Sequence, residues 1–187
     1  MDQRGLVERA REGDHDAFAV LAGATVARLD AAARLILRDR ELARDAVQDA
    51  LLRAWRDLPG LRDPERFEAW LHRLTVNSCL DAARRRRRRP IEVELTPISG
   101  PTVSDIAAVV ADRDLLDNAL RRLDPEWRAV VVLHYFLGMP LPDVAVALRI
   151  PLGTAKSRLH RSLGAMRSTI EGTDEAVHTP IPGGQFA

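Results

Sequence analysis

Cysteine is nearly absent from this 187-residue chain, in which Cys79 is the only one. A single thiol excludes a disulfide framework, and it fits the reducing environment of the cytoplasm. Lysine is equally scarce, because Lys156 is the one ammonium side chain among 28 basic residues. The positive charge is therefore almost entirely guanidinium, which suits planar contacts to phosphate and guanine. An arginine-rich composition also arises from genome base composition alone.

Long apolar runs and catalytic motifs are missing as well. No stretch is apolar enough to span a membrane, and charged residues interrupt the N-terminus where a secretory signal would need an apolar segment. We therefore expect a cytoplasmic protein with no membrane contact of its own. No phosphate-binding loop, H-E-x-x-H or G-x-S-x-G motif occurs, so we expect no catalytic residue, cofactor or metal. His72 and Cys79 would lie about 10 Å apart along a helix, too far for shared ligation.

Apolar residues recur at helical spacing along most of the chain, and no strand or repeat pattern is present. The sequence predicts an all-α protein of two small helical domains joined by an extended linker, the second containing a helix-turn-helix. We expect a first domain at residues 1–89, a linker at 90–112, a second domain at 113–171 and a disordered tail at 172–187. The expected helices cover residues 2–12, 14–37, 41–58, 64–88, 115–123, 125–137, 142–148 and 152–170.

The linker is rich in proline and has no helical periodicity. Fully stretched, it would reach on the order of 75 Å. That length would let two DNA-binding lobes sit one or two helical turns apart, at about 34 Å per turn.

Residues 139–167 read MPLPDVAVALRIPLGTAKSRLHRSLGAMR and predict two helices joined by a tight turn at Arg149, Ile150 and Pro151. The second helix is predicted to bury an apolar face made of Leu152, Ala155, Leu159, Leu163, Met166 and Ile170. The opposite face carries Thr154, Lys156, Ser157, Arg158, His160 and Arg161. A solvated face usually mixes both signs of charge, whereas no acidic residue occurs at 149–170. The pattern therefore favours a helix that enters the major groove of DNA.

Six consecutive arginines, Arg84 to Arg89, end the helix predicted at residues 64–88. The net charge of the chain is only +1, so any affinity for nucleic acid must come from local clusters such as this one. An arginine run is often a solvated tail, but this one extends an amphipathic helix. Because the clustered guanidinium groups repel one another, we expect a polyanion such as a phosphate backbone to bind them.

Three segments, in this order and spacing, resemble the extracytoplasmic function (ECF) group of bacterial RNA polymerase sigma factors. They are DAVQDALLRAW at residues 45–55, FEAWLHRLTVNSCLDAARR at 67–85 and LGMPLPDVAVALRIPLGTAKSRLHRSLGAMR at 137–167. The similarity covers about residues 5–168. It implies a protein that binds core RNA polymerase, directs promoter-specific initiation through −10 and −35 elements, and helps to open the DNA. It also implies an anti-sigma factor as a partner.

The resemblance implies a polymerase contact in the first domain. This contact would dock on the coiled coil of the largest-subunit clamp, with the flap as a further polymerase contact, and its residues are Asp45, Gln48, Asp49 and Leu52. Asp49 stands where the family usually has Glu, so the charge is kept with a reach one methylene shorter. Arg44 replaces a frequent acidic residue.

The resemblance also implies promoter contacts. The loop at residues 58–66 matches the segment that captures a flipped −10 base, and the expected −10 contacts are Leu61, Arg62, Arg73, Asn77, Arg84 and Arg85. The loop has no aromatic residue to stack on a base, so we expect backbone and polar contacts to dominate. The −35 element would be read by Thr154, Lys156, Ser157, Arg158, His160 and Arg161. Arg158 and Arg161 are the strongest candidates for phosphate or guanine contacts.

Structural roles compete with some of these assignments. Asn77 is as well suited to capping or bridging helices as to binding DNA. Trp55, Trp70 and Trp127 fall on apolar stripes and are expected in the core.

Two other functions remain in competition. A stand-alone helix-turn-helix regulator would bind DNA without polymerase, usually as a dimer on a palindromic site, and the 45–55 segment and the two lobes argue against it. A nucleic-acid enzyme would need a catalytic constellation, which the sequence does not contain.

Overall fold

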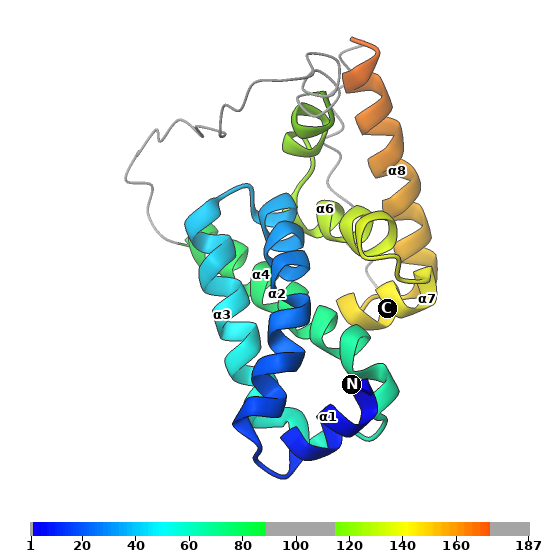
Figure 1. The fold of residues 1–187 in the computed structure, drawn as a ribbon. Coiled ribbons are helices and arrows are strands. Elements are labelled where there is room, and N and C mark those ends of the chain that lie inside the picture. Colours follow the sequence, from blue (N-terminus) through cyan, green and yellow to red (C-terminus); the bar gives the residue numbers. More distant parts are fainter. Residues whose placement is uncertain (1, 89–114, 173–187) are drawn as a thin grey trace, which may run out of the picture.

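The computed structural model describes residues 2–88 and 115–172, and every regular element within them is helical (Figure 1). The first stretch forms α1 (Gln3–Arg11), α2 (His15–Leu37), α3 (Arg40–Asp57) and α4 (Phe67–Arg88), with the 3-10 turns η1 (Leu58–Gly60) and η2 (Pro64–Arg66) between α3 and α4. We call it the N-terminal region. The predicted all-α fold is confirmed. The predicted linker at 90–112, and the predicted tail from residue 173 onward, lie outside the described residues.

The second stretch, which we call the C-terminal region, begins with helical residues 115–121. It continues through α6 (Pro125–Val131), η3 (Val132–Phe136), α7 (Leu141–Leu148) and α8 (Leu152–Ile170). The sequence predicts one α-helix over residues 125–137, and the structure differs because η3 is a π-helical turn. Gly138, with a φ of 70°, ends this segment in a backbone conformation that glycine adopts without strain.

Aspartates begin the helices of the N-terminal region. Asp2, Asp14 and Asp39 each accept a hydrogen bond from a backbone N–H in the first turn of α1, α2 and α3. Arg38 ends α2 in the left-handed conformation, with a φ of 57°, between the helices expected at residues 14–37 and 41–58. α3 begins one residue earlier than expected, at Arg40.

The two regions pack against each other. One hydrophobic core contains Ile36 and Leu71 of the N-terminal region together with Val130, Leu133 and Val144 of the C-terminal region. α2 contacts α6 and η3, and α4 contacts α6 and α7, so the regions lie side by side (Figure 1). The length of the linker would allow wide separation. The structure instead has what we call the closed arrangement, because apolar faces of both regions are buried together.

Part of the predicted buried face of α8 is wrong. Ala155 and Met166 are buried, but so is Ser162, which has an exposed fraction of 0%. The helix packs on α6 and α7 along this slightly rotated line. Three predicted core positions are instead exposed by 36–48%, namely Leu152, Leu163 and Ile170.

No helix within the described residues is both long and apolar enough to cross a bilayer.

Candidate nucleic-acid interface

α7 and α8 form the predicted helix-turn-helix. The turn between them depends on Arg149, whose left-handed backbone (φ 55°) reverses the chain. The backbone N–H of Ile150 then donates to the carbonyl of Ala145 at 3.0 Å, which closes the end of α7. Pro151 precedes α8 and sets an extended entry into its first turn. These local features reverse the chain between α7 and α8, which pack against each other.

The cationic face of α8 divides into an open and a covered part. Lys156, Ser157, His160 and Arg161 are exposed, whereas Thr154 and Arg158 are half-buried. The Nε atom of Arg158 is buried and has no hydrogen-bond partner within the described residues. In the closed arrangement, one of the two strongest −35 candidates is therefore turned toward the N-terminal region.

The loop between α3 and α4 is the predicted −10 segment. It consists of two 3-10 turns, and the second begins where Asp63 accepts a hydrogen bond from the backbone N–H of Glu65 at 3.1 Å. Arg62 is exposed, but Leu61 is buried with an exposed fraction of only 8%. The Leu61 side chain packs into the core, so only its backbone groups are left to contact DNA, and the assignment of Leu61 to the −10 element stays a prediction.

Trp70 lies at the edge of the core. The sequence predicts Trp55, Trp70 and Trp127 in the core, and all three are half-buried, with Trp70 and Trp127 packed against core clusters. Trp70 lines a cavity of about 520 Å³ together with Arg62, Arg73 and Asp63 of the −10 segment and its neighbourhood. The loop itself has no aromatic residue, but Trp70 supplies one from the first turns of α4. The opposite wall comes from the C-terminal region, through Met139, Asp143, Val146 and Ala147.

Asn77 and Arg73 continue this surface along α4, where both are half-buried. The Asn77 amide has no hydrogen-bond partner among the described residues, so the structure does not support capping or bridging as its role. A half-exposed amide with free donors and acceptors is suited to binding a base or a phosphate.

The arginine run at the end of α4 is largely neutralised by the protein itself. Of the five arginines of this run that the structure describes, Arg84 to Arg87 each form an ion pair with a carboxylate, and the exposed Arg88 forms none within the described residues. These pairs reduce the self-repulsion of the run, and the binding of a polyanion stays a prediction. Arg89 lies outside the described residues. The pairs are Arg84–Asp81 at 3.4 Å, Arg85–Asp49 at 3.7 Å, Arg86–Asp39 at 2.8 Å and Arg87–Asp124 at 2.8 Å. All eight side chains are substantially exposed, so phosphates can replace these carboxylates at small cost.

The residues assigned to polymerase form one face of α3. Asp45 and Gln48 are exposed, and the Leu52 side chain is 70% exposed, which is unusual for leucine. Asp49 is half-buried and pairs with Arg85, so residues assigned to polymerase and to DNA touch each other. A single exposed leucine does not by itself mark a binding surface, so the assignment of this face to polymerase stays a prediction.

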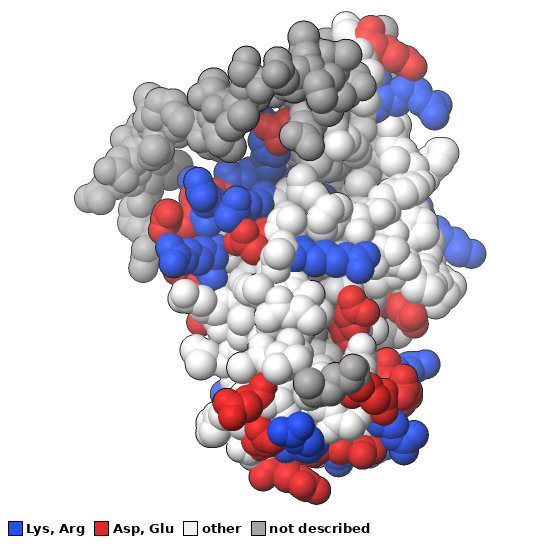
Figure 2. Space-filling model, in the orientation of Figure 1, with Lys and Arg blue, Asp and Glu red and all other residues white. Residues whose placement is uncertain are grey.

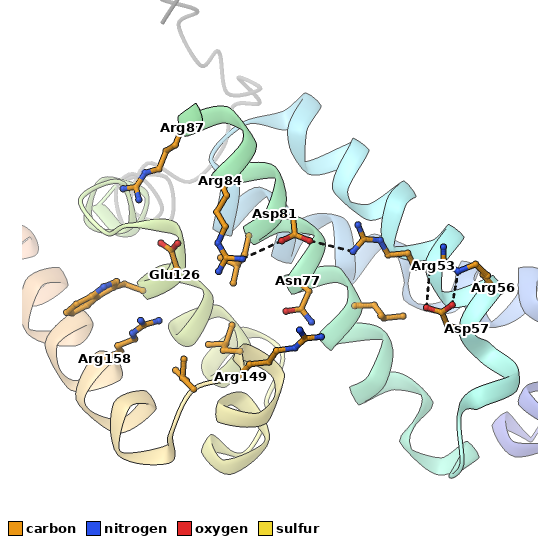
Figure 3. A pocket seen from close by; sticks show the side chains of 15 residues that line it. Arg53, Arg56, Asp57, Asn77, Asp81, Arg84, Arg87, Glu126, Arg149 and Arg158 are labelled. Carbon is orange, nitrogen blue, oxygen red and sulfur yellow. Dashed lines mark hydrogen bonds and ion pairs between the residues drawn. The ribbon is translucent and has the colours of Figure 1, made fainter. Parts of the chain in front are cut away.

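A second cavity, of about 790 Å³, lies between the two regions (Figure 3). It brings together Asn77 and Arg84, assigned to the −10 element, with Arg158, assigned to the −35 element. Figure 3 shows Arg149, in the turn before α8, pointing toward Asn77 of α4. Part of each predicted set of DNA contacts thus lines a space that is too small to admit duplex DNA, whereas Arg62, Lys156 and Arg161 are exposed.

Charge on the molecular surface is mixed. On the face in Figure 2, acidic and basic side chains lie side by side at the α1 end, and most of the C-terminal region is uncharged. A single-sign patch is therefore absent from this face.

Cys79 and His72 lie in the interior of the N-terminal region. Burial raises the pKa of the Cys79 thiol to about 12, so it is not a reactive thiolate. Burial also lowers the pKa of His72. Among the residues that the structure describes, no three histidine, cysteine or acidic side chains come together as a metal site.

Comparisons with known protein families match both halves of the chain. Residues 22–89 match the family "Sigma-70 region 2", and residues 113–166 match "Sigma-70, region 4". The matches occur in this order along the chain, on either side of the predicted linker.

Curated relatives extend over most of the chain. The ECF RNA polymerase sigma factor SigM of Mycobacterium tuberculosis is 37% identical over 152 residues, which cover 80% of this chain and 75% of SigM. RNA polymerase sigma-E factor of Streptomyces avermitilis is 34% identical, with 76% and 78% covered. The ECF sigma factor SigW of Bacillus subtilis is 27% identical over 180 residues, with 88% and 94% covered.

Two solved structures with a similar fold are complexes with a second protein. CnrH in complex with the cytosolic domain of CnrY has a TM-score of 0.66 and 26% identity, covering 92% of this chain and 99% of that chain. RpoE of Bartonella quintana, in complex with the anti-sigma factor NepR, has a TM-score of 0.67 and 22% identity, and it shows the shared fold. With both family matches and the SigM similarity, the chain belongs to the ECF group of the RNA polymerase sigma-70 family.

Proposed function

We propose that this protein binds core RNA polymerase and directs promoter-specific transcription initiation by recognising −10 and −35 elements. The main support for this proposal is where the two family matches lie. The region 2 match lies on the N-terminal region, which bears the exposed α3 face, and the region 4 match lies on the C-terminal region, which bears the cationic α8 face. Sigma factors are transcription initiation factors. We further propose that this one acts by binding alone, in the cytoplasm where the polymerase works, without catalytic residues, metal or cofactor.

Polymerase docking is assigned to the α3 face. Leu52 supplies apolar area, while Asp45, Gln48 and Asp49 supply directional polar contacts to the clamp coiled coil. Asp49 must release Arg85 to do so, at small cost because that pair is exposed. The flap is the second polymerase contact that we propose.

Promoter contacts are assigned to α4, its preceding loop and α8. At the −10 element, Arg62, Arg73, Asn77, Arg84 and Arg85 would bind phosphates or an extruded base, and Leu61 would contribute backbone groups only. Trp70 adds the aromatic surface on which such a base could stack. At the −35 element, contacts would come from Thr154, Lys156, Ser157, Arg158, His160 and Arg161.

We infer that the two regions must separate before both elements are bound. Arg158 and Asn77 line one cavity in the closed arrangement, and its volume of about 790 Å³ is too small to admit a duplex. We propose domain limits of 1–89 and 113–171, with residues 90–112 as the linker that permits separation and 172–187 as a tail. A protein of the anti-sigma class, such as the partner that the RpoE structure names, is the proposed antagonist of opening.

The test is transcription in vitro from a promoter library with core polymerase, with and without the full chain. We expect transcripts from a small set of promoters only when the protein is present. The double variant Asp45→Ala, Gln48→Ala should lose this activity through weaker polymerase binding. Absence of promoter-dependent transcripts, or tight dimeric binding to a palindrome without polymerase, would instead support a stand-alone regulator.

A further inference from the structure

The cavity between the regions is unusually rich in guanidinium groups (Figure 3). α3 and α4 of the N-terminal region supply four of them, and the turn and helix of the helix-turn-helix supply two. Only three carboxylates line the same space of about 790 Å³. The lining arginines are Arg53, Arg56, Arg84, Arg87, Arg149 and Arg158, and the carboxylates are Asp57, Asp81 and Glu126.

Four of the six lining arginines form ion pairs with carboxylates, and the other two, Arg149 and Arg158, form none within the described part of the chain. Asp81 is shared by Arg53 at 3.6 Å and Arg84 at 3.4 Å. The other two arginines of the N-terminal region are paired as well, Arg56 with Asp57 and Arg87 with Asp124, each at 2.8 Å.

Arg149 and Arg158 form no ion pair or hydrogen bond through their side chains within the described residues. The Nε atom of Arg158 is buried without any partner, which carries a desolvation cost that a bound acceptor would remove. Both unpaired groups line a cavity in which one carboxylate, Glu126, is also without an ion pair among the described residues. With six guanidinium groups and three carboxylates, the lining has an excess of positive charge that a bound anion can balance.

The remaining lining adds groups that suit a nucleotide. Trp127 is half-buried and lines the cavity, so its indole offers an aromatic surface next to the guanidinium groups. The Asn77 amide has free donors and acceptors, and Arg149 points toward it (Figure 3). The volume lies within the range of small-ligand sites and is far too small for a duplex. Several guanidinium groups around one space match the multiple negative charges of a polyphosphate better than the single charge of a carboxylate.

We propose that this cavity binds a small polyphosphate anion, either a nucleoside triphosphate or an oligophosphate, and that the bound anion holds the closed arrangement. The ligand bridges Arg84 of α4 to Arg149 and Arg158 of the C-terminal region, so it binds only when the regions are together. Its effect on transcription rests on the proposed function, because the anion would compete with promoter DNA for Asn77, Arg84 and Arg158.

The experiment measures binding to the full chain by isothermal titration calorimetry at 150 mM salt, on the order of physiological ionic strength, without polymerase or DNA. The probes are ATP and tripolyphosphate, which share a triphosphate but differ in the nucleoside. Tighter binding of ATP assigns a nucleotide, with the base on Trp127, and equal binding assigns an oligophosphate. Binding of neither probe up to millimolar concentration overturns the proposal.

Matched variants locate the site. The double variant Arg149→Asn, Arg158→Gln should weaken binding by about tenfold or more. Asn keeps the left-handed backbone that position 149 needs. The control Arg167→Gln removes an exposed arginine from the same helix, outside the cavity, and should leave the affinity unchanged. Equal affinities of the double variant and this control would overturn the proposal.

Small-angle scattering should also show a smaller radius of gyration with ligand than without, if the unliganded chain opens. Lack of transcription in the polymerase assay would refute the proposed function and leave this binding result standing. If neither probe binds but the protein still initiates transcription, the anion site is refuted and the proposed function stands.

Discussion

Arg38 and Asp117 form a two-point ion pair across the boundary between the two regions. Both terminal nitrogens of Arg38, at the end of α2, donate to the two carboxylate oxygens of Asp117, in the helix at residues 115–121. The Arg38 side chain is only 12% exposed. Hydrogen bonding from Arg38 holds the pKa of Asp117 below its usual range. This contact joins residues that are 79 positions apart and acts as a latch on the closed arrangement.

Substitution of Asp117 should therefore favour opening. Asp117→Asn keeps the side-chain shape but removes the charge, which should weaken the contact between regions by about 1.5–3 kcal/mol. The expected result is a larger radius of gyration in small-angle scattering. Asp16→Asn is the control, because Asp16 is an exposed carboxylate in the first turn of α2 without an ion pair in the described structure. An unchanged scattering profile for Asp117→Asn would refute the latch.

Burial of the Arg128 guanidinium group carries a free-energy cost in the folded protein. Its side chain is 7% exposed, its Nε atom has no hydrogen-bond partner in the described part of the chain, and burial, with Arg38 nearby, lowers its pKa to about 10. Arg128→Met removes this cost and should raise the free energy of unfolding by about 1–3 kcal/mol. The change in the free energy of unfolding is measured by urea unfolding, with Arg167→Met as the control. A less stable Arg128→Met would mean that Arg128 contributes a favourable contact.

The cationic face of α8 should carry −35 recognition. Arg158→Ala and Arg161→Ala should each cost about 1–3 kcal/mol of promoter affinity in the complex with polymerase if they contact bases. Arg161 is exposed and Arg158 is turned into the cavity, so only Arg158→Ala should also change the closed arrangement. Promoter affinity is measured by titration at fixed salt, with Arg167→Ala as control. Retention of full affinity in both variants would remove α8 from the interface.

Leu52 should contribute to polymerase binding without contributing to stability. Because the side chain is 70% exposed, Leu52→Ala removes little buried area in the free protein. We expect an unchanged melting temperature and weaker affinity for core polymerase, by about 1–2 kcal/mol. Ile170→Ala, an exposed apolar residue at the end of α8, is the control. Equal polymerase affinity in the two variants would contradict the assignment of the α3 face.

Stability should fall in mild acid because of His72. Burial lowers the pKa of His72 below its ordinary 6.5, and its Nε2 atom is buried without a partner among the described residues. Between these two pKa values the unfolded chain binds a proton that the folded chain does not bind. The stability that the neutral form of His72 contributes is therefore complete above about pH 6.5, and it is lost as the pH falls toward the folded-state pKa.

The measurement is urea unfolding at several pH values between 7.5 and 5, which we take as roughly the range where histidine titrates. His72→Leu should flatten the dependence, and the exposed His160→Gln should not. Equal pH dependence in wild type and His72→Leu would show that another group is responsible.

Much of the fold follows from local pattern. The role of Asp14 as a helix cap can be predicted from its place before an apolar segment, and the break at residues 38–40 from its polar residues. The helix-turn-helix can be predicted from Pro151 and from the three- and four-residue spacing of apolar side chains. The π turn η3 and the burial of Ser162 on α8 could not be predicted from local pattern. For α8, packing against α6 and α7 decides which of several similar helical faces is buried.

The candidate site shows the same division. Exposure of Asp45, Gln48 and Arg161 is what their helical positions predict. The burial of Leu61 and the place of Trp70 beside the −10 loop depend on how α4 and the 3-10 turns meet.

By itself the sequence determined the helices, their ends and the membership of the family, because periodicity, capping and short motifs are properties of neighbouring residues. Only the tertiary structure decided that the regions close on each other, that the arginines at the end of α4 find carboxylates, and that Arg158 faces Asn77 across a cavity. The physical reason is that such partners lie far apart in the chain, and burial of shared apolar surface, which no local pattern encodes, brings them together.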